Sequence, residues 1–288
     1  MAAAGAASSS GSVDGGRMDM SQYLFYIRTI NCSELKSIFE CLRDLVSDAN
    51  LKVTQNALKL VVIDPSHVAL SYVRLDADKF DTYYCEREII VGLSLIKLHP
   101  LIRPITNNDV LSIYIEKSDP NRLAIMIQNK EKRSLTIKKI NTLDINSEDI
   151  TFPNTDYEYD SIITLPSVDF QRLMRDLREI SNIVEIRSVS NTLYFYSKGA
   201  FSEQRTVLGD SEEGGVSFQQ GGRGRDDIVV QGFYGLRYLA LFSKCASLSQ
   251  IVQLYLKNNF PLILSYSVSL GDIKFCLAPS NGFDEDVG

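Results

Sequence analysis

The sequence predicts an α+β fold of two similar domains, each with two helices packed on antiparallel sheet. Three observations support this: amphipathic helical stretches recur along the chain, each is followed by two β-rich runs, and the composition is that of an ordinary globular protein. The 288 residues are 44% hydrophobic and 23% charged, which is typical of a folded chain. At roughly 100–200 residues per domain, this length corresponds to about two domains.

The helical stretches are recognised by apolar residues at i, i+3, i+4 and i+7. Four of them are expected, at about 33–48, about 93–103, after Pro166 as far as about Ile180, and about 234–246. Pro104 ends the second stretch because proline cannot continue a helix.

Each helix is followed by a strand, a polar turn and a second strand. Alternating residues such as Leu123, Ile125 and Ile127 indicate half-buried antiparallel strands. A unit of one helix and two strands occurs four times, which indicates two successive internal duplications. The expected strand pairs are 51–54 with 58–63, 110–116 with 122–128, 183–189 with 192–197, and 251–256 with 262–268.

Segments without this pattern set the domain boundaries. Residues 1–20 are mostly small and are expected to form a disordered tail. Residues 141–159 carry acids, Asn and Pro and are expected to be an interdomain connecting loop. The domains are then 21–140 and 160–280, followed by an acidic tail at 281–288. The glycine-rich segment 209–225 is expected to be a mobile loop.

Cysteine usage and hydropathy indicate an intracellular protein. The five cysteines show no C-x-x-C pairing, which suits a reducing compartment. No apolar run approaches the roughly 18–20 residues that a membrane span needs, so no membrane association is expected. The N-terminus lacks the basic and apolar regions of a signal peptide.

Basic residues recur on the flanks of the helices although the net charge is −6. Lys36 and Arg43 are seven residues apart and share one side of the first helix, and Arg237 and Lys244 repeat this spacing. For any single helix, a solvated charged face is the ordinary interpretation. Repetition across four helices favours a shared cationic surface, which would bind phosphates without reading bases and would be salt-dependent.

No catalytic or metal-binding motif is present in the sequence. The two histidines, His67 and His99, lack zinc-site spacing, and no nucleotide-binding glycine motif follows a predicted strand. No cofactor or metal is therefore expected. One enzymatic hypothesis remains open, an acid/base site at Asp64 and His67.

Several segments closely resemble the proliferating cell nuclear antigen (PCNA) family of sliding clamps. They follow the family's order from about Leu24 to Pro279, whereas the N-terminal tail and the enlarged 209–225 segment depart from its pattern, as in a divergent or viral member. The matching segments are DPSHV at 64–68, FDTYYC at 80–85, LPS at 165–167 with RLMRDL at 172–177, LRYL at 236–239 with Lys244, and FCLAP at 275–279.

The resemblance implies a DNA sliding clamp, a non-enzymatic processivity factor that encircles duplex DNA independently of sequence. It implies a closed homotrimeric ring in the DNA-clamp fold, with sheets outside and helices around the hole. Its partners would be DNA polymerase, repair enzymes with short clamp-binding peptides, and an ATP-dependent clamp loader, in the nucleus or in a viral replication compartment. The subunit interface would join the strand near 133–140 to the strand near 204–208 of the next subunit.

The same resemblance implies two sets of site residues. The DNA-facing set is Lys36, Arg43, Lys97, Arg103, Arg172, Arg175, Arg237 and Lys244. The partner-peptide groove would be formed by Ile63, His67, Val68, Leu70, Ile150, Phe152, Pro153, Pro261, Ala278, Pro279 and Ser280.

Two alternatives stay open at this point. A subunit of a heterotrimeric checkpoint-type clamp would share the fold without associating with itself, and solution mass would distinguish it. An enzyme with its site at Asp64 and His67 would lose turnover in a His67→Ala variant, whereas a clamp would lose only partner binding.

Overall fold

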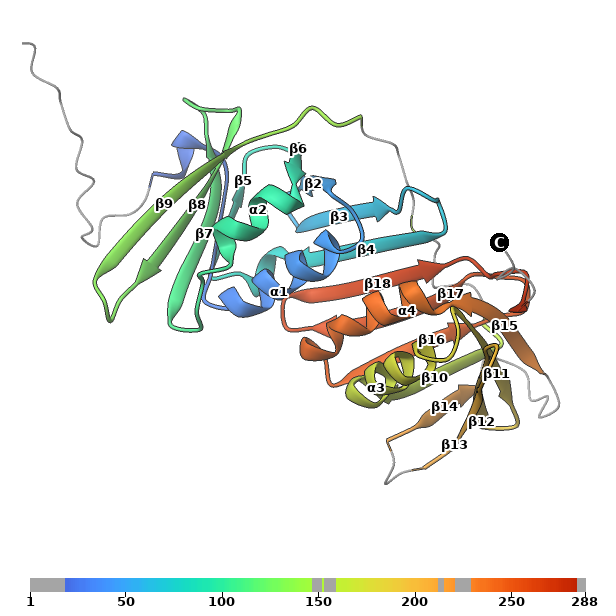
Figure 1. Ribbon diagram of the computed structural model, residues 1–288. Coiled ribbons are helices and arrows are strands. Elements are labelled where there is room, and N and C mark those ends of the chain that lie inside the picture. The colour runs from blue at the N-terminus through green and yellow to red at the C-terminus, as the bar shows by residue number, and fades with distance from the viewer. Residues whose placement is uncertain (1–18, 147–151, 153–158, 212–214, 221–228, 284–288) are drawn as a thin grey trace, which may run out of the picture.

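The computed structural model describes residues 19–146, 152, 159–211, 215–220 and 229–283. Its two halves lie side by side, each with antiparallel strands and two α-helices on one side of them (Figure 1). No helix within these described ranges is long and apolar enough to cross a membrane.

Two of the sheets belong to one half each. The N-terminal sheet has the order β5-β1-β7-β8-β9, and the C-terminal sheet has the order β13-β12-β11-β15. The N-terminal strands are β1 (Tyr23–Thr29), β5 (Thr82–Cys85), β7 (Asp109–Glu116), β8 (Arg122–Asn129) and β9 (Ser134–Asn141). The C-terminal strands are β11 (Ile183–Val189), β12 (Thr192–Lys198), β13 (Glu203–Gly209) and β15 (Val230–Gly235).

A nine-stranded sheet in the described chain is shared by both halves, in the order β14-β10-β16-β17-β18-β4-β3-β2-β6. The halves meet where β18 pairs antiparallel with β4, from Gly271 opposite Leu75 to Leu277 opposite Ala69. The strands are β2 (Asp48–Val53), β3 (Ala57–Ile63), β4 (Ala69–Asp76), β6 (Ile89–Ser94), β10 (Ser161–Pro166), β14 (Ser217–Gln220), β16 (Ile251–Leu256), β17 (Leu262–Val268) and β18 (Gly271–Leu277).

The helices confirm the repeated pattern that the sequence predicts. Each α-helix precedes a strand pair: α1 precedes β2 and β3, α2 precedes β7 and β8, α3 precedes β11 and β12, and α4 precedes β16 and β17. Short 3₁₀ turns also occur at η1 (Met20–Gln22), η2 (Ala77–Lys79) and η3 (Ser243–Ser247). The α-helices are α1 (Cys32–Arg43), α2 (Leu95–Ile102), α3 (Ser167–Arg178) and α4 (Leu236–Phe242).

Two predicted helix ends are wrong. The first helix ends at Arg43 rather than near residue 48, because the N–H groups of Leu45 and Val46 both close onto the Leu42 carbonyl and the chain then enters β2. The fourth helix ends at Phe242 and continues as the 3₁₀ turn η3, a tightening that is common at helix ends. Lys244 therefore lies on η3 and not on an α-helix.

The expectation of a loop throughout 209–225 is also wrong. Residues Ser217–Gln220 form strand β14, which pairs with β10 at the edge of the shared sheet. Val216 is buried and Phe218 packs against the core, so burial of these two alternating apolar residues stabilises the strand. Residues 212–214 and 221–228 lie outside the described residues.

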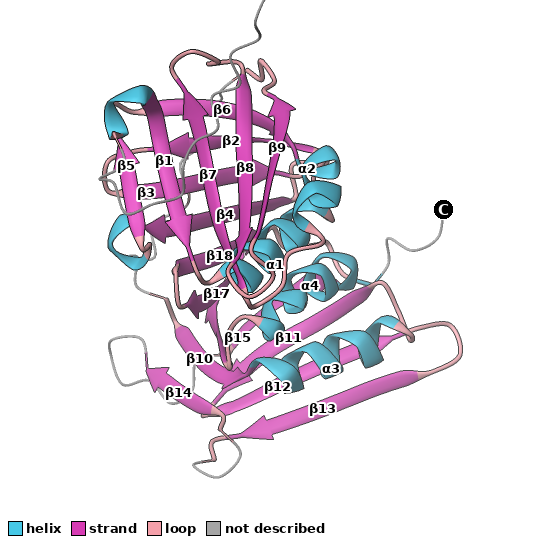
Figure 2. Cartoon of the chain, turned by 90° about the vertical axis from the view of Figure 1, so that its left-hand side faces the viewer, coloured by secondary structure: helices cyan, strands magenta, loops and turns pink. Residues whose placement is uncertain are grey.

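The helices form one continuous row on the same face of the molecule, as Figure 2 shows. Along this row α2 contacts α1, α1 contacts η3, and η3 and α4 contact α3. The row is held in place by its apolar side, where Leu35, Ile38 and Leu42 of α1 and Phe170 and Met174 of α3 are buried. Burial of each such side chain contributes about 1.5–3 kcal/mol, and the polar sides of the four helices are left facing outward together.

Candidate nucleic-acid interface and partner groove

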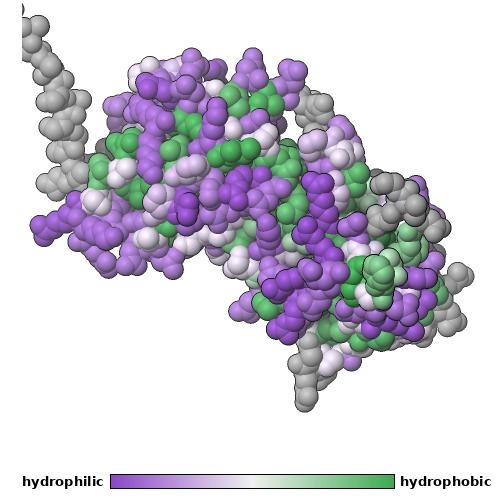
Figure 3. Space-filling model, in the orientation of Figure 1, coloured by the Kyte–Doolittle hydropathy of each residue, from purple (hydrophilic) through white to green (hydrophobic). Residues whose placement is uncertain are grey.

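The exposed face of the helix row carries most of the predicted cationic residues. Hydrophilic side chains gather over the helices in Figure 3. Five of these residues are exposed and form no ion pair with another described residue, so their charges are available to a ligand. They are Lys97 and Arg103 at α2, Arg172 and Arg175 on α3, and Arg237 on α4.

Three other predicted DNA-facing residues are engaged within the protein. Lys36 donates hydrogen bonds to the carbonyl oxygens of Arg103, at 2.8 Å, and Ile105, at 3.4 Å, and so ties α1 to the end of α2. Arg43 pairs with Asp44 at 2.8 Å, and Lys244 donates to the second oxygen of the same carboxylate. The cationic surface is therefore less uniform than the sequence suggests.

Asp44 joins the two halves of the subunit on this face. It follows α1, whereas Lys244 belongs to η3 in the C-terminal half. Burial alone would raise the pKa of Asp44, but hydrogen bonds from Lys244 and Arg43 hold it below the ordinary value. The carboxylate stays charged at neutral pH and neutralises cations that would otherwise face a phosphate backbone.

The predicted subunit-interface segments are both sheet edges. Strand β9 ends the N-terminal sheet and β13 ends the C-terminal sheet in the described chain. Leu135 and Ile137 of β9 and Val207 of β13 are 48%, 50% and 50% exposed, respectively. Unpaired edges with exposed apolar side chains are surfaces that another strand can cover.

Part of the predicted peptide groove forms one apolar cluster. Leu70 and Phe152 pack with the buried residues Tyr159, Ile263 and Cys276. The Phe152 ring also lies 5.5 Å from the Tyr72 ring, so Phe152 itself packs against residues of β4 and β18. Ile150 and Pro153, two other predicted groove residues, lie outside the described residues.

The turn between β3 and β4 forms the neighbouring wall. Ile63 ends β3 and is half-buried, whereas His67 and Val68 are exposed. The N–H of Ala278 donates to the Val68 carbonyl at 2.9 Å, so the segment after β18 is held against this turn. His67 has a φ of 57°, a left-handed conformation that suits a tight turn.

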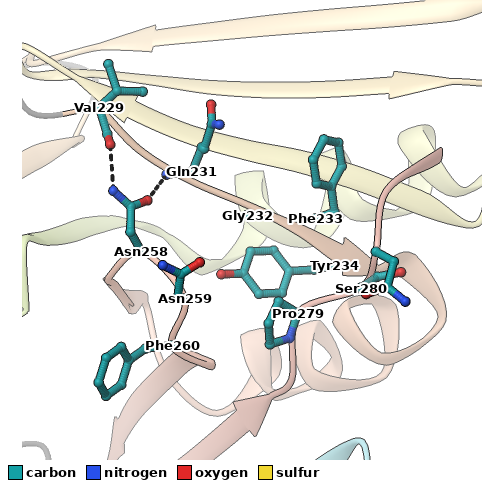
Figure 4. Close-up of a pocket in the computed structure, with 11 residues that line it drawn as sticks. Val229, Gln231, Gly232, Phe233, Tyr234, Asn258, Asn259, Phe260, Pro279 and Ser280 are labelled. Carbon is teal, nitrogen blue, oxygen red and sulfur yellow. Dashed lines mark hydrogen bonds between the residues drawn. The ribbon is translucent and has the colours of Figure 1, made fainter.

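A cavity of about 540 Å³ lies beside this C-terminal segment. Pro279 and Ser280 line it, as predicted, but Ile63, His67, Val68, Leu70, Phe152, Pro261 and Ala278 do not. Figure 4 shows Phe233, Tyr234 and Phe260 around it, and an Asn258 amide that accepts from Gln231 N–H at 2.9 Å and donates to the Val229 carbonyl at 2.8 Å.

Sequence reasoning missed these aromatic residues of the cavity. Phe260 directly follows the polar residues Lys257, Asn258 and Asn259, and a large apolar side chain beside a polar turn was the signal that the sequence offered. In the structure this side chain is 44% exposed, as expected of a residue at a binding surface. Phe233 and Tyr234 gave no such signal, because they lie on the strand β15 and only pairing places them beside Pro279.

The carboxylate of Asp64 is occupied by structural hydrogen bonds. It accepts from the N–H groups of Ser66, Val68 and Ala69 at 2.6–3.1 Å and from the Tyr238 hydroxyl at 2.7 Å. Burial opposes ionisation, yet these hydrogen bonds, led by that from Ala69, hold the pKa of Asp64 below its ordinary value. This is the environment of a turn-organising carboxylate rather than of a general base. Across the described ranges, no group of three His, Cys, Asp or Glu residues could hold a metal ion.

Comparison with known proteins identifies the family. The family model for the N-terminal domain of proliferating cell nuclear antigen matches residues 24–149, and that for its C-terminal domain matches residues 153–281. The chain belongs to the PCNA family. This membership makes it a DNA sliding clamp and does not favour the heterotrimeric checkpoint alternative. The family is one of non-catalytic processivity factors that interact with DNA and polymerase and form oligomers.

Two relatives agree with this assignment. A protein of Paramecium bursaria Chlorella virus 1 described as "Probable DNA polymerase sliding clamp 1" is 32% identical over 267 residues, which cover 91% of this chain and 99% of the viral one. The crystal structure of PCNA from Entamoeba histolytica superimposes with a TM-score of 0.80 at 23% identity, covering 90% of this chain and 99% of that one. The structural match shows that the fold is shared.

Proposed function

We propose that three copies of this chain close into a ring around duplex DNA and act there as a processivity factor. The observation that carries this proposal is the row of four helices, which presents Lys97, Arg103, Arg172, Arg175 and Arg237 on one face without ion-pair partners among the described residues. In a closed ring this face would line the hole.

The ring is closed by pairing β9 of one subunit with β13 of the next. Both strands are edges of similar length, Ser134–Asn141 and Glu203–Gly209, and both carry exposed apolar side chains. Pairing removes the free edges and covers Leu135, Ile137 and Val207. Because the two edges belong to opposite ends of one subunit, the contact is head-to-tail, and a head-to-tail contact that closes generates a ring.

The binding mechanism is topological. Lysine and arginine side chains meet phosphates through charge alone, so the ring reads no base sequence and can slide. Weak, salt-sensitive contacts are sufficient because a closed ring cannot leave a DNA circle. A polymerase tethered to it has a high effective concentration at the primer end.

Linearisation of the DNA tests the topological mechanism. The trimer is loaded on nicked circular DNA by an ATP-dependent clamp loader and then separated from free protein by gel filtration. Cutting the circle with a restriction enzyme should release the protein within minutes, whereas an uncut circle keeps it. Equal retention on linear DNA with free ends contradicts the proposal.

The partner site consists of the exposed turn at His67 and Val68, the Leu70–Phe152 cluster, and the cavity beside Pro279 and Ser280. It is suited to a short peptide with a hydrophobic plug, because apolar and aromatic walls surround a few fixed polar groups such as the Asn258 amide. Polymerases and repair enzymes would dock there. Ile150, Pro153 and Pro261 belong to this proposal by family resemblance alone.

Substitution of Val68 tests the partner site. Val68 is 36% exposed, and its carbonyl already receives the Ala278 N–H, so Val68→Asp changes the surface with little change in folding. We expect the affinity for a fluorescent polymerase-tail peptide to fall at least tenfold by anisotropy, since a buried carboxylate costs more than about 1.4 kcal/mol. The control Ile90→Asp, at a residue 47% exposed on β6, should bind normally. Unchanged binding by Val68→Asp places the peptide elsewhere.

A closed ring cannot thread onto DNA without ends, so the proposal includes an ATP-dependent loader that opens one β9–β13 contact. The protein then acts where DNA is replicated, in a nucleus or in a viral replication compartment.

A further inference from the structure

A second pocket lies on the face of the C-terminal sheet that is turned away from the core. It has a volume of about 220 Å³, and its lining residues occupy alternate positions of β11, β12 and β13, so their side chains share one face. The intervening residues, such as Ile186 and Phe195, are fully buried in the core. The lining of this arginine pocket is Glu185, Arg187, Tyr194, Tyr196 and Arg205.

Two arginines are held over one tyrosine ring in the arginine pocket. The guanidinium carbon of Arg187 lies 4.8 Å from the centroid of the Tyr194 ring, and that of Arg205 lies 5.2 Å from the same centroid. Both distances are within the roughly 6 Å at which a cation is attracted to an aromatic ring. The ring therefore keeps two positive charges near each other, although like charges repel.

The two guanidinium groups have hydrogen-bond donors available for a ligand. Neither Arg187 nor Arg205 forms an ion pair with another described residue. The Nε atom of Arg187 is buried and has no hydrogen-bond partner within the described ranges. Because an unpaired buried donor costs free energy, a ligand that accepts a hydrogen bond at this nitrogen is favoured.

The charges of the lining favour a singly charged anion. Two arginines face one acid, Glu185, which likewise forms no ion pair with another described residue. Guanidinium forks match the geometry of a carboxylate, which accepts two parallel hydrogen bonds. Glu185 repels a doubly charged phosphate more strongly than a carboxylate. The arginine pocket is therefore suited to the side chain of Asp or Glu.

The arginine pocket adjoins the proposed partner site. Across the neighbouring strands β11 and β15, Arg187 lies opposite Gln231 and Glu185 lies opposite Phe233. Residues that face each other across two antiparallel strands share one side of the sheet. Gln231 and Phe233 line the cavity beside Pro279 (Figure 4), so the linings of the cavity and of the arginine pocket are neighbours on one face.

The C-terminal segment borders both sites. The Phe283 ring lies 5.2 Å from the Phe233 ring and 5.6 Å from the Tyr196 ring, each in edge-to-face geometry. It therefore contacts one lining residue of the cavity and one lining residue of the arginine pocket. The two sites form a single surface, with an apolar part on β15 and a charged part on β11 to β13.

We propose that the arginine pocket is a second anchor for partner peptides and binds an acidic side chain that lies beyond the hydrophobic plug. This inference rests on the proposed function, because the plug must occupy the cavity for the acid to reach the arginines. Strands are roughly 4.8 Å apart, and a peptide residue spans at most roughly 3.6 Å, so about two or three residues cross from β15 to Arg187 and Tyr194. Partners with an acid at this spacing are preferred over neutral ones.

Matched peptides test the proposal. A fluorescent polymerase-tail peptide is extended at either end by Gly-Asp-Glu or by the neutral Gly-Asn-Gln, and binding to the trimer is measured by anisotropy. At low salt, one acidic extension should raise the affinity about threefold to tenfold over its neutral match, as expected of one or two partly exposed charge-assisted contacts. The gain should shrink at about 0.5 M salt. Acidic extensions that add nothing at either end overturn the proposal.

Substitutions in the arginine pocket test the assigned residues. Arg187→Gln and Arg205→Gln should each abolish the gain, whereas Glu185→Gln should increase it, because loss of a negative charge favours a carboxylate. All three variants should bind the neutral peptide as the wild type does. Lys198→Gln is the matched control, since Lys198 is an exposed cation of β12 on the same face but outside the lining, and it should keep the gain.

The two arginine variants change different strands, so one of them decides if light scattering shows that the other no longer forms a trimer. A gain that survives the substitution of either arginine in a trimeric protein overturns the proposal. So does a Glu185→Gln protein in which the gain falls, because a purely structural role of the cluster would weaken binding in every variant.

Two further results distinguish other causes. Asp284, Glu285 and Asp286 follow Phe283 in the sequence and lie outside the described residues. If replacing these acids by Asn, Gln and Asn raises the affinity for the acidic peptide at least tenfold, and Arg205→Gln cancels that rise, the ligand is the chain's own segment and the proposal is overturned. If the neutral peptide does not bind, the proposed partner site fails and this inference fails with it. If the neutral peptide binds and Val68→Asp weakens it, an absent gain overturns this inference alone.

Discussion

At the scale of single residues, buried carboxylates organise the molecule. Asp64 gathers three backbone N–H groups of its own turn and the Tyr238 hydroxyl of α4, and so connects the N-terminal half to a helix of the C-terminal half. Asp109 acts locally in the same way, accepting from Thr106 N–H at 2.7 Å and from the Asn129 amide at 2.7 Å. Each of these bonds to a charged acceptor contributes about 1.5–3 kcal/mol.

The lowered pKa of Asp64 predicts an acid-dependent loss of stability. The unfolded carboxyl titrates near its ordinary pKa of 3.8, above the folded value, so the unfolded chain binds more protons in this range and the unfolding free energy rises with pH. The stabilisation is complete above that pKa and is lost as pH falls through the folded one. In urea titrations at constant protein concentration, Asp64→Asn should be less stable by about 1–3 kcal/mol at pH 7. It should also lose less stability than the wild type on acidification, and an equal acid-dependent loss in both proteins would contradict this role.

At the scale of elements, hydrophobic periodicity predicted which segments form helices and strands more reliably than where each helix ends. Strands β11, β16 and β17 have the predicted bounds, because alternation of buried and exposed residues is a local property of the sequence. The change from α4 to the 3₁₀ turn η3 was not visible, because both are short helical segments with similar apolar spacing. Lys244 of η3 pairs with Asp44, and this single ion pair alters the charge that the helix row presents.

Removal of the Asp44 charge should strengthen DNA binding. In Asp44→Asn the cations of Arg43 and Lys244 are released toward the phosphates, so affinity for a duplex should rise at low salt. The slope of log affinity against log salt should steepen by about 0.9 for each new phosphate contact. Anisotropy of a labelled duplex over a salt series measures both quantities.

Asp119 provides a matched control for this experiment. Its carboxylate also pairs with two cations, Arg122 at 2.7 Å and Lys139 at 3.3 Å, but it lies in the turn between β7 and β8, away from the helix row. Asp119→Asn should leave DNA binding unchanged. Weaker binding by Asp44→Asn, or equal gains in both variants, would show that Asp44 does not limit the cationic surface.

At the scale of the whole molecule, the open edges of the sheets lie apart from the face that carries the helices. The helix row occupies one face, while the open edges β9 and β13 belong to different sheets in the two halves. This separation allows subunits to join edge to edge while the helices of every subunit stay on the same side of the sheets. The four-fold repeat in the sequence gives each subunit two similar halves, so three subunits would provide six similar segments of one ring.

A charged residue on the edge strand should prevent ring closure. Ile137 is 50% exposed on β9, and Ile137→Glu would place a carboxylate in the β9–β13 contact, where it has no water to solvate it. Light scattering should show the mass falling from about three times 32.3 kDa to 32.3 kDa. Ile90→Glu, at a similarly exposed residue of another edge strand, β6, should remain trimeric. A trimeric Ile137→Glu protein would place the interface elsewhere.

Local residue patterns were enough to predict the fold class, the order of helices and strand pairs, and the family. These depend on hydrophobic periodicity and on short motifs, which are properties of neighbouring residues. It also predicted the exposed cations Arg172, Arg175 and Arg237, because an amphipathic helix that buries one side must expose the other.

The availability of these side chains and the contacts between distant residues depend instead on tertiary packing. The pairing of β18 with β4 and the ion pair of Lys244 with Asp44 join segments about 200 residues apart, and the aromatic cavity beside Pro279 is lined by residues from different strands. Such contacts depend on how whole layers pack against each other. A local pattern of residues therefore does not indicate which distant residue a side chain will contact.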